Sequence, residues 1–74
     1  MFKEMKLKAQ IRKCQDQIDF LEKKRSRSQA ALVSAILNHT EPADEDVDFF
    51  NTYTAQIEEV RELMRNLTNE LNAK

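Results

Sequence analysis

Residues 50–71 read FNTYTAQIEEVRELMRNLTNEL, and this stretch decides the fold. Its apolar side chains recur at alternating intervals of three and four residues: Phe50, Tyr53, Ile57, Val60, Met64, Leu67 and Leu71. This spacing places them on one stripe of an α-helix, at positions a and d of a heptad repeat. Phe49 and Leu63, at position g, and Val47 and Thr54, at position e, widen the stripe. The pattern therefore predicts a long amphipathic helix over about residues 44–72.

The first half of the chain, over about residues 3–37, has the same periodicity. Its positions a and d are occupied by Leu7, Ile11, Cys14, Ile18, Leu21, Arg25, Ser28, Leu32 and Ala35. All of these residues are apolar except Arg25 and Ser28. No proline or glycine interrupts the stretch, so we expect one continuous helix.

The two polar residues at core positions allow two interpretations. In the first, they fix the register or the choice of partner at some cost in stability, and Arg25 reaches Glu58 or Glu62 of the second helix. In the second, the repeat contains a stutter, after which Val33 and Ile36 face inward and Arg25 faces water. The sequence alone leaves both interpretations open.

Residues 38–43, Asn-His-Thr-Glu-Pro-Ala, form the predicted turn between the helices. Asn38 is a residue that tolerates the left-handed conformation at a helix end. Pro42 disfavours helical geometry at Glu41, and Asp44 is a candidate N-cap for the second helix. Because so short a loop joins two long helices, we predict an all-α fold, an antiparallel two-helix hairpin of the coiled-coil type.

The composition excludes several classes of protein. The chain has 74 residues with no glycine, one proline and one cysteine. Without glycine, primed hairpin turns and glycine-rich phosphate loops are disfavoured, which argues against all-β and nucleotide-binding folds. No apolar run approaches the roughly 18 residues of a membrane span, so we expect no membrane partner. A single cysteine and no recognisable secretory signal indicate a cytoplasmic protein.

The small size of the chain predicts self-association. A core built from fewer than about 70–80 residues rarely supplies more than 3–5 kcal/mol, and this chain has no disulfide to add to it. We expect the hairpin to complete a four-helix bundle by forming a homodimer. Two helices cannot cover all the large apolar side chains, and the predicted protein interface is Phe20, Ile36, Leu37, Phe49 and Phe50.

The charges are divided between the halves of the chain. Residues 1–30 carry nine basic and four acidic groups, whereas residues 31–74 carry three basic and nine acidic groups. We expect the basic helix to pair with the acidic one. Lys23, Lys24 and Arg27 form a basic cluster that offers an alternative role in nucleic-acid binding. The sequence pI of about 5.8 and the absence of interleaved aromatic residues argue against that role.

The sequence contains no arrangement typical of an enzyme. Cys14 and His39 fall at opposite ends of the predicted first helix, too far apart to form a nucleophile and base. The acidic residues at 41–48 lack the spacing and the central glycine of a calcium-binding loop. We therefore expect no catalytic activity, no metal and no cofactor.

In layout alone, the chain resembles small helix-hairpin proteins such as the plasmid RNA-binding protein Rop and the hairpin chaperones of bacterial secretion systems. The resemblance implies two functions. The favoured one is a protein-interaction module, acting as a homo-oligomer or as an adaptor or chaperone for a helical client. The alternative is a Rop-like regulator that binds RNA or DNA through the basic first helix.

Overall fold

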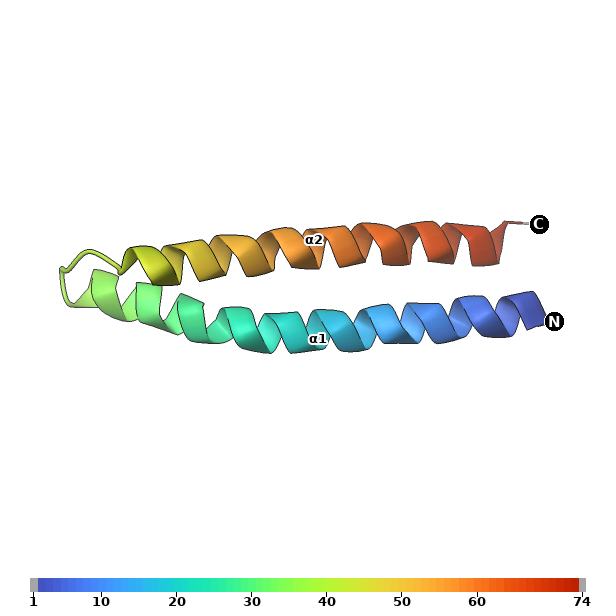
Figure 1. Ribbon diagram of the computed structural model, residues 1–74, viewed down its shortest axis with the longest axis horizontal. Helices are drawn as coiled ribbons and strands as arrows, with labels where there is room; N and C mark the ends of the chain where they lie inside the picture. The colour runs from blue at the N-terminus through green and yellow to red at the C-terminus, as the bar shows by residue number, and fades with distance from the viewer. Residues whose placement is uncertain (1, 74) are drawn as a thin grey trace.

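In the computed structural model, residues 2–73 form two antiparallel helices joined by a short loop (Figure 1). Helix α1 spans Phe2–Leu37 and helix α2 spans Asp44–Asn72. They lie side by side as a rod with extents of 56 × 16 × 15 Å, and both ends of the chain lie at the end opposite the loop. This arrangement confirms the predicted all-α, two-helix antiparallel hairpin.

The core lies between the two helices along the predicted a and d positions. Its buried cluster comprises Cys14, Ile18, Leu21, Ile57 and Val60, with Tyr53, Met64 and Leu67 packed against it. Ile57 has no exposed surface and is the most deeply buried residue. Every a and d position named from the sequence is buried or half-buried. The heptad pattern therefore identified the inward side of both helices.

The helical repeat continues through Arg25 and Ser28 without a stutter. Ser28 is only 6% exposed and Arg25 is half-buried, whereas Val33 and Ile36 are 47% and 66% exposed. The interpretation in which Val33 and Ile36 face inward is therefore wrong. A polar pair occupies the core of α1, one turn before its apolar end.

Arg25 contacts residues nearer the turn than the sequence predicted. Its Nη1 donates a hydrogen bond to Thr54 Oγ1 at 3.4 Å, and its guanidinium lies 5.8 Å from the centre of the Phe50 ring. The predicted contact with Glu58 or Glu62 is wrong. Helix α1 reaches past the start of α2 at the turn (Figure 1), and Arg25 contacts an earlier part of α2 than expected.

Helix α1 ends in a Schellman motif built without glycine. The Thr40 N–H donates to the Ala35 carbonyl at 2.9 Å and the His39 N–H donates to the Ile36 carbonyl at 3.1 Å. His39 takes the left-handed conformation, with φ of 55°. The prediction that Asn38 fills this role is wrong, because the motif places the left-handed residue one position later. The only histidine in the chain thus has a structural role at the turn.

Helix α2 begins without a side-chain cap. Ala43 occupies the N-cap position, and its carbonyl accepts from the N–H groups of Asp46 and Val47 at 3.0 and 3.2 Å. Asp44 is the first helical residue, so the prediction that it caps the helix is wrong. Acidic residues in the first turn instead complement the helix dipole.

Candidate protein-interaction surface

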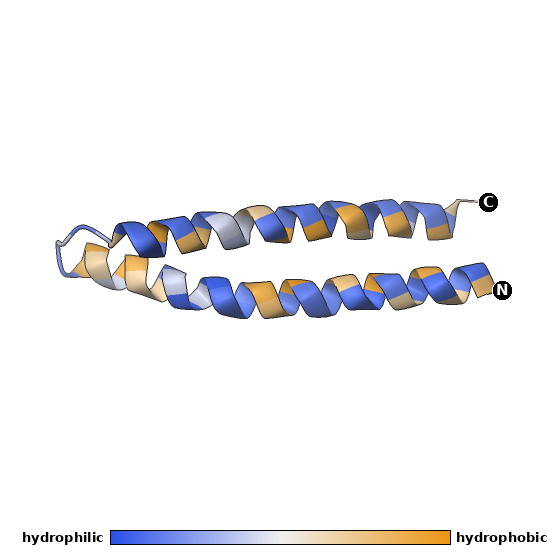
Figure 2. Cartoon of the chain, in the orientation of Figure 1, coloured by the Kyte–Doolittle hydropathy of each residue, from blue (hydrophilic) through white to orange (hydrophobic). Residues whose placement is uncertain are grey.

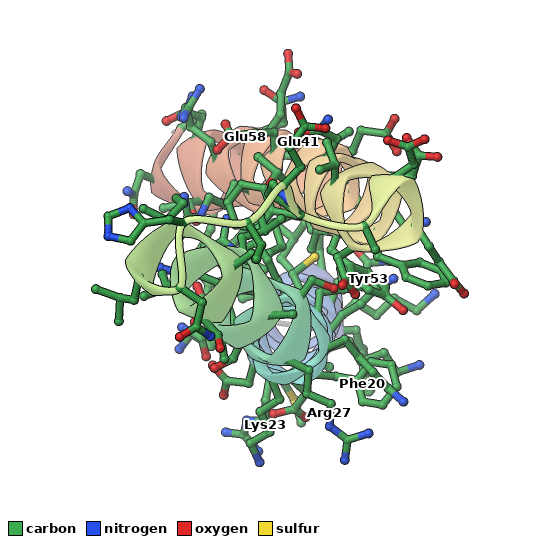
Figure 3. The ribbon with its side chains drawn as sticks, turned by 90° about the vertical axis from the view of Figure 1, so that its left-hand side faces the viewer. Phe20, Lys23, Arg27, Glu41, Tyr53 and Glu58 are labelled. Atoms are coloured by element: carbon green, nitrogen blue, oxygen red, sulfur yellow. The ribbon has the colours of Figure 1, made fainter. Side chains whose placement is uncertain are left out.

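The hairpin has two broad faces, one on each side of the plane through the helix axes. We call the side with positions c and g the Phe20 face; its principal residues are Phe20, Lys24, Phe49, Tyr53 and Leu63. We call the side with positions b and e the Glu22 face; its principal residues are Glu22, Thr54, Glu58 and Arg61. Figure 3 shows Phe20 and Tyr53 projecting on one side and Glu58 on the other.

The Phe20 face exposes large apolar side chains from both helices. Phe20, Phe49 and Leu63 are 58%, 44% and 51% exposed. Phe49 stacks on Tyr53 with ring centroids 6.2 Å apart, and Lys24 Nζ lies 5.4 Å from the centroid of Phe20. These contacts hold the aromatic rings in place and leave much of their surface in water. Leu63 was recognised from the sequence at position g but was not predicted at the interface, although that position was the signal for it.

Two hollows on the Phe20 face lie between the helices. The first has a volume of about 280 Å³ and is lined by Gln10, Lys13, Cys14, Gln17, Leu63 and Leu67. The second has a volume of about 240 Å³ and is lined by Lys24, Arg27, Ser28, Asp46, Phe49 and Tyr53. Each reaches a buried residue of α1, Cys14 in one and Ser28 in the other. Hollows of this kind accept side chains of a packing helix, as in knobs-into-holes packing.

Polar contacts within the chain join the two helices in the middle of the Glu22 face. Arg61 of α2 donates to Glu22 Oε1 of α1 at 3.2 Å and to Glu58 Oε1 at 3.4 Å. The bond from Arg25 to Thr54 also bridges the helices, since Thr54 is at position e. These contacts join the helices in the middle of the Glu22 face, whereas the exposed apolar residues at positions b and e, Met5, Val33, Ile36 and Val47, lie nearer its two ends.

The predicted interface residues do not form a single surface. Phe20 and Phe49 lie on the Phe20 face, whereas Phe50 is half-buried beside the guanidinium of Arg25. Ile36 and Leu37 are 66% and 73% exposed at the turn end of α1. Figure 2 shows that this end of α1 is apolar over most of its surface. The structure thus separates an apolar corner at the turn from the apolar face along the rod.

The basic cluster lies on the side of α1 away from α2. Lys23 and Arg27 are exposed and project in the direction opposite to Glu41 and Glu58 (Figure 3). Lys24 instead covers the ring of Phe20. These labelled basic and acidic residues are therefore on opposite sides of the rod, whereas Lys24 lies on the Phe20 face.

The expected pairing of a basic helix with an acidic one is weakly developed within the hairpin. Among residues 2–73 two ion pairs join the helices. Lys3 Nζ lies 3.9 Å from Glu70 Oε1, which follows the expected direction. The pair between Arg61 and Glu22 has the opposite direction, with the base on α2 and the acid on α1. Within residues 2–73, most basic residues of α1 and most acidic residues of α2 therefore face solvent or another molecule and do not pair with the other helix.

Cys14 and His39 are far apart, as the sequence indicated. Cys14 is buried in the core, and roughly 35 Å of helix separates it from the turn that holds His39. Within the described range, no group of three or more His, Cys, Asp or Glu residues is placed to hold a metal ion. Neither helix in that range has a stretch long and apolar enough to cross a membrane. No protein-family model, curated protein or solved structure matches this chain.

Proposed function

We propose that the chain is a non-catalytic protein-interaction module that buries its Phe20 face against further helices. The simplest form is a homodimer that completes a four-helix bundle, and the same surface suits an adaptor or chaperone for a helical client. The observation that carries the proposal is the exposure of Phe20, Phe49 and Leu63 on one face, beside two hollows that reach the core.

The energetics favour burial of this face. Fully burying a Phe or Leu side chain contributes about 1.5–3 kcal/mol, so three such residues together rival the few kcal/mol expected from so small a core. Folding and association are then coupled by mass action. The melting temperature should rise with protein concentration.

The test replaces the two exposed aromatic residues of the face with charged ones. Light scattering on the wild-type chain should give about twice the chain mass of 8.7 kDa. The Phe20→Glu, Phe49→Glu double variant should have the monomer mass and a lower melting temperature. Ile36→Glu, Leu37→Glu, at the turn corner, is the matched control and should remain dimeric. Equal mass, helicity and melting temperature in the wild type and the Phe20, Phe49 variant would overturn the proposal.

The second candidate function is RNA or DNA binding through the outer side of α1. The exposure of Lys23 and Arg27, on the opposite side of the rod from Glu41 and Glu58, supports it, because exposed bases are accessible to phosphate groups. A labelled RNA hairpin and a labelled DNA duplex, titrated with the wild-type chain, provide the test. Binding that weakens steeply with salt and is lost in Lys23→Ala, Arg27→Ala would support this candidate. Absence of binding at low salt would exclude it.

A further inference from the structure

Charges of opposite sign are separated across the Phe20 face. Every charged residue at positions c and g of α1 within the described range is basic: Lys3, Lys6, Lys13, Lys24 and Arg27. Every charged residue at the same positions of α2 is acidic: Glu45, Glu59 and Glu70. On the Glu22 face, positions b and e of both helices carry both signs. The face that exposes Phe20, Phe49 and Leu63 is thus bordered by a basic row on α1 and an acidic row on α2.

Two twofold arrangements bring the Phe20 faces of two copies together. With the axis along the rod, α1 of each copy lies against α2 of the other and both turns lie at the same end. With the axis across the rod, α1 lies against α1, α2 lies against α2 and the turns lie at opposite ends. The first arrangement places each basic row beside an acidic row. The second places basic beside basic and acidic beside acidic, which is unfavourable.

We propose that the Phe20 face binds a second copy of this chain with the twofold axis along the rod, so that α1 of each copy packs on α2 of the other. This inference rests on the proposed function and specifies its partner and orientation. The four helices then alternate basic and acidic around the bundle. Each copy contributes one basic row and one acidic row to a closed, symmetric interface.

The apolar residues fit this orientation. When the rods run in the same direction, a residue of α1 lies level with the same part of α2 in the other copy as in its own chain. Glu22 is level with Arg61, since these residues pair at 3.2 Å. Phe20 of one copy is therefore level with Leu63 of the other, and the contact occurs twice by symmetry. The exposed side chains of one copy cover those of the other.

The acidic residues at the turn are compatible with two turns at the same end. Asp44 and Asp48 fall at positions b and f, away from the Phe20 face. Asp46 lines the hollow that also contains Lys24 and Arg27, so basic groups surround it. Asp44 and Asp48 are therefore directed away from the interface and Asp46 lies next to bases, whereas Glu45, at position c, borders the interface.

The distance between the two turns tests the orientation. A spin label is attached to Glu41→Cys in a Cys14→Ala chain, and the distance between labels in the dimer is measured by electron–electron double resonance. We expect less than about 30 Å, because neighbouring helices in a bundle lie about 8–10 Å apart. The crosswise arrangement would give a distance near the 56 Å length of the rod. A label at Asp19→Cys, near the middle of α1, is the control and gives a short distance in both arrangements.

Each outcome is decisive. A turn-to-turn distance near the rod length in a sample of dimer mass overturns the orientation and leaves the proposed function standing. A monomer mass with no distance between copies overturns the self-association itself. If Cys14→Ala lowers the helicity, the same label is placed on the chain that retains Cys14, since a buried thiol at 4% exposure reacts slowly.

Discussion

The two faces of the hairpin lie on either side of the same core but differ in the contacts that their side chains make. In the middle of the Glu22 face, Arg61 bridges carboxylates from both helices, and Arg25 bonds to Thr54. On the Phe20 face, Phe49 and Leu63 extend from the core into water. The shared core holds the hairpin together, and in the proposed function the Phe20 face is the one on which another helix packs.

The difference arises from residues on either side of the core positions of α2. Position g holds Phe49 and Leu63, whereas position e holds Val47 near the turn and then the polar residues Thr54 and Arg61. Because g and e lie on opposite sides of the a and d stripe, one heptad repeat gives an apolar flank and a polar flank. A short periodic sequence can therefore direct association to one face without any additional structure.

The largest expected effect comes from truncating Ile57, the most deeply buried residue of the core between the two faces. Ile57→Ala should cost about 2–5 kcal/mol, which equals or exceeds the stability expected of so small a core. We expect loss of the helical circular dichroism signal at room temperature and, with it, loss of association. Glu62→Ala, at the exposed outer position f of the same helix, is the control and should keep both. Retention of full helicity in Ile57→Ala would show that stability comes mainly from contacts outside the hairpin.

The next largest effect comes from placing a charge on one face of α2 and, for comparison, on the other. Leu63 and Val47 are partly exposed aliphatic residues of α2, at positions g and e. Leu63→Glu should weaken dimerisation about 10- to 100-fold, because it removes about 1.5–3 kcal/mol of apolar burial. Val47→Glu should leave the dissociation constant nearly unchanged. Sedimentation equilibrium measures both, and equal losses in the two variants would contradict the assignment of the interface to one face.

The sequence predicted the helices and their inward stripes because heptad spacing is a local property. Leu7, Ile18 and Val60 could be placed in the core from spacing alone, and the structure confirms them as buried. The same frame correctly retained Ser28 at a core position, where its polarity gave no such indication. The periodicity within each helix was enough to assign these residues to the core.

The grouping of the exposed residues could not be predicted, because it depends on how the helices are aligned. Phe49 and Phe50 are adjacent in sequence, yet Phe50 packs beside Arg25 and Phe49 lies on the Phe20 face. That contact requires α1 to extend past the start of α2 at the turn. The turn between the helices contains the Schellman motif at His39, and no periodic pattern describes its path.

A smaller effect is expected from replacing Arg25, the half-buried polar residue at a core position of α1. Replacing a half-buried, paired Arg25 with leucine is expected to be neutral or stabilising by about 1 kcal/mol, which raises the melting temperature by about 4–8 °C. A polar residue that fixes the register excludes alternative oligomers. Its loss in Arg25→Leu should therefore allow several oligomers and give a mixture of masses by light scattering. Lys23→Leu, on the outer side of α1, is the control. A lower melting temperature with a single dimer mass would show that Arg25 stabilises the fold instead.

The smallest expected effect compares two adjacent glutamates that lie on different faces. Glu59, at position c, belongs to the acidic row of the Phe20 face, and Glu58, at position b, belongs to the Glu22 face. Because Glu59 would border a basic row in the dimer, Glu59→Lys should weaken association several-fold, in line with about 0.5–1 kcal/mol for an exposed charge pair. Glu58→Lys loses its bond to Arg61 within the chain, which should lower the melting temperature slightly and leave the dissociation constant unchanged. Sedimentation equilibrium at low and high salt separates the two, since the loss in Glu59→Lys should diminish as salt screens the charges. If Glu59→Lys strengthened the dimer or left it unchanged at low salt, the basic row could not lie against the acidic one.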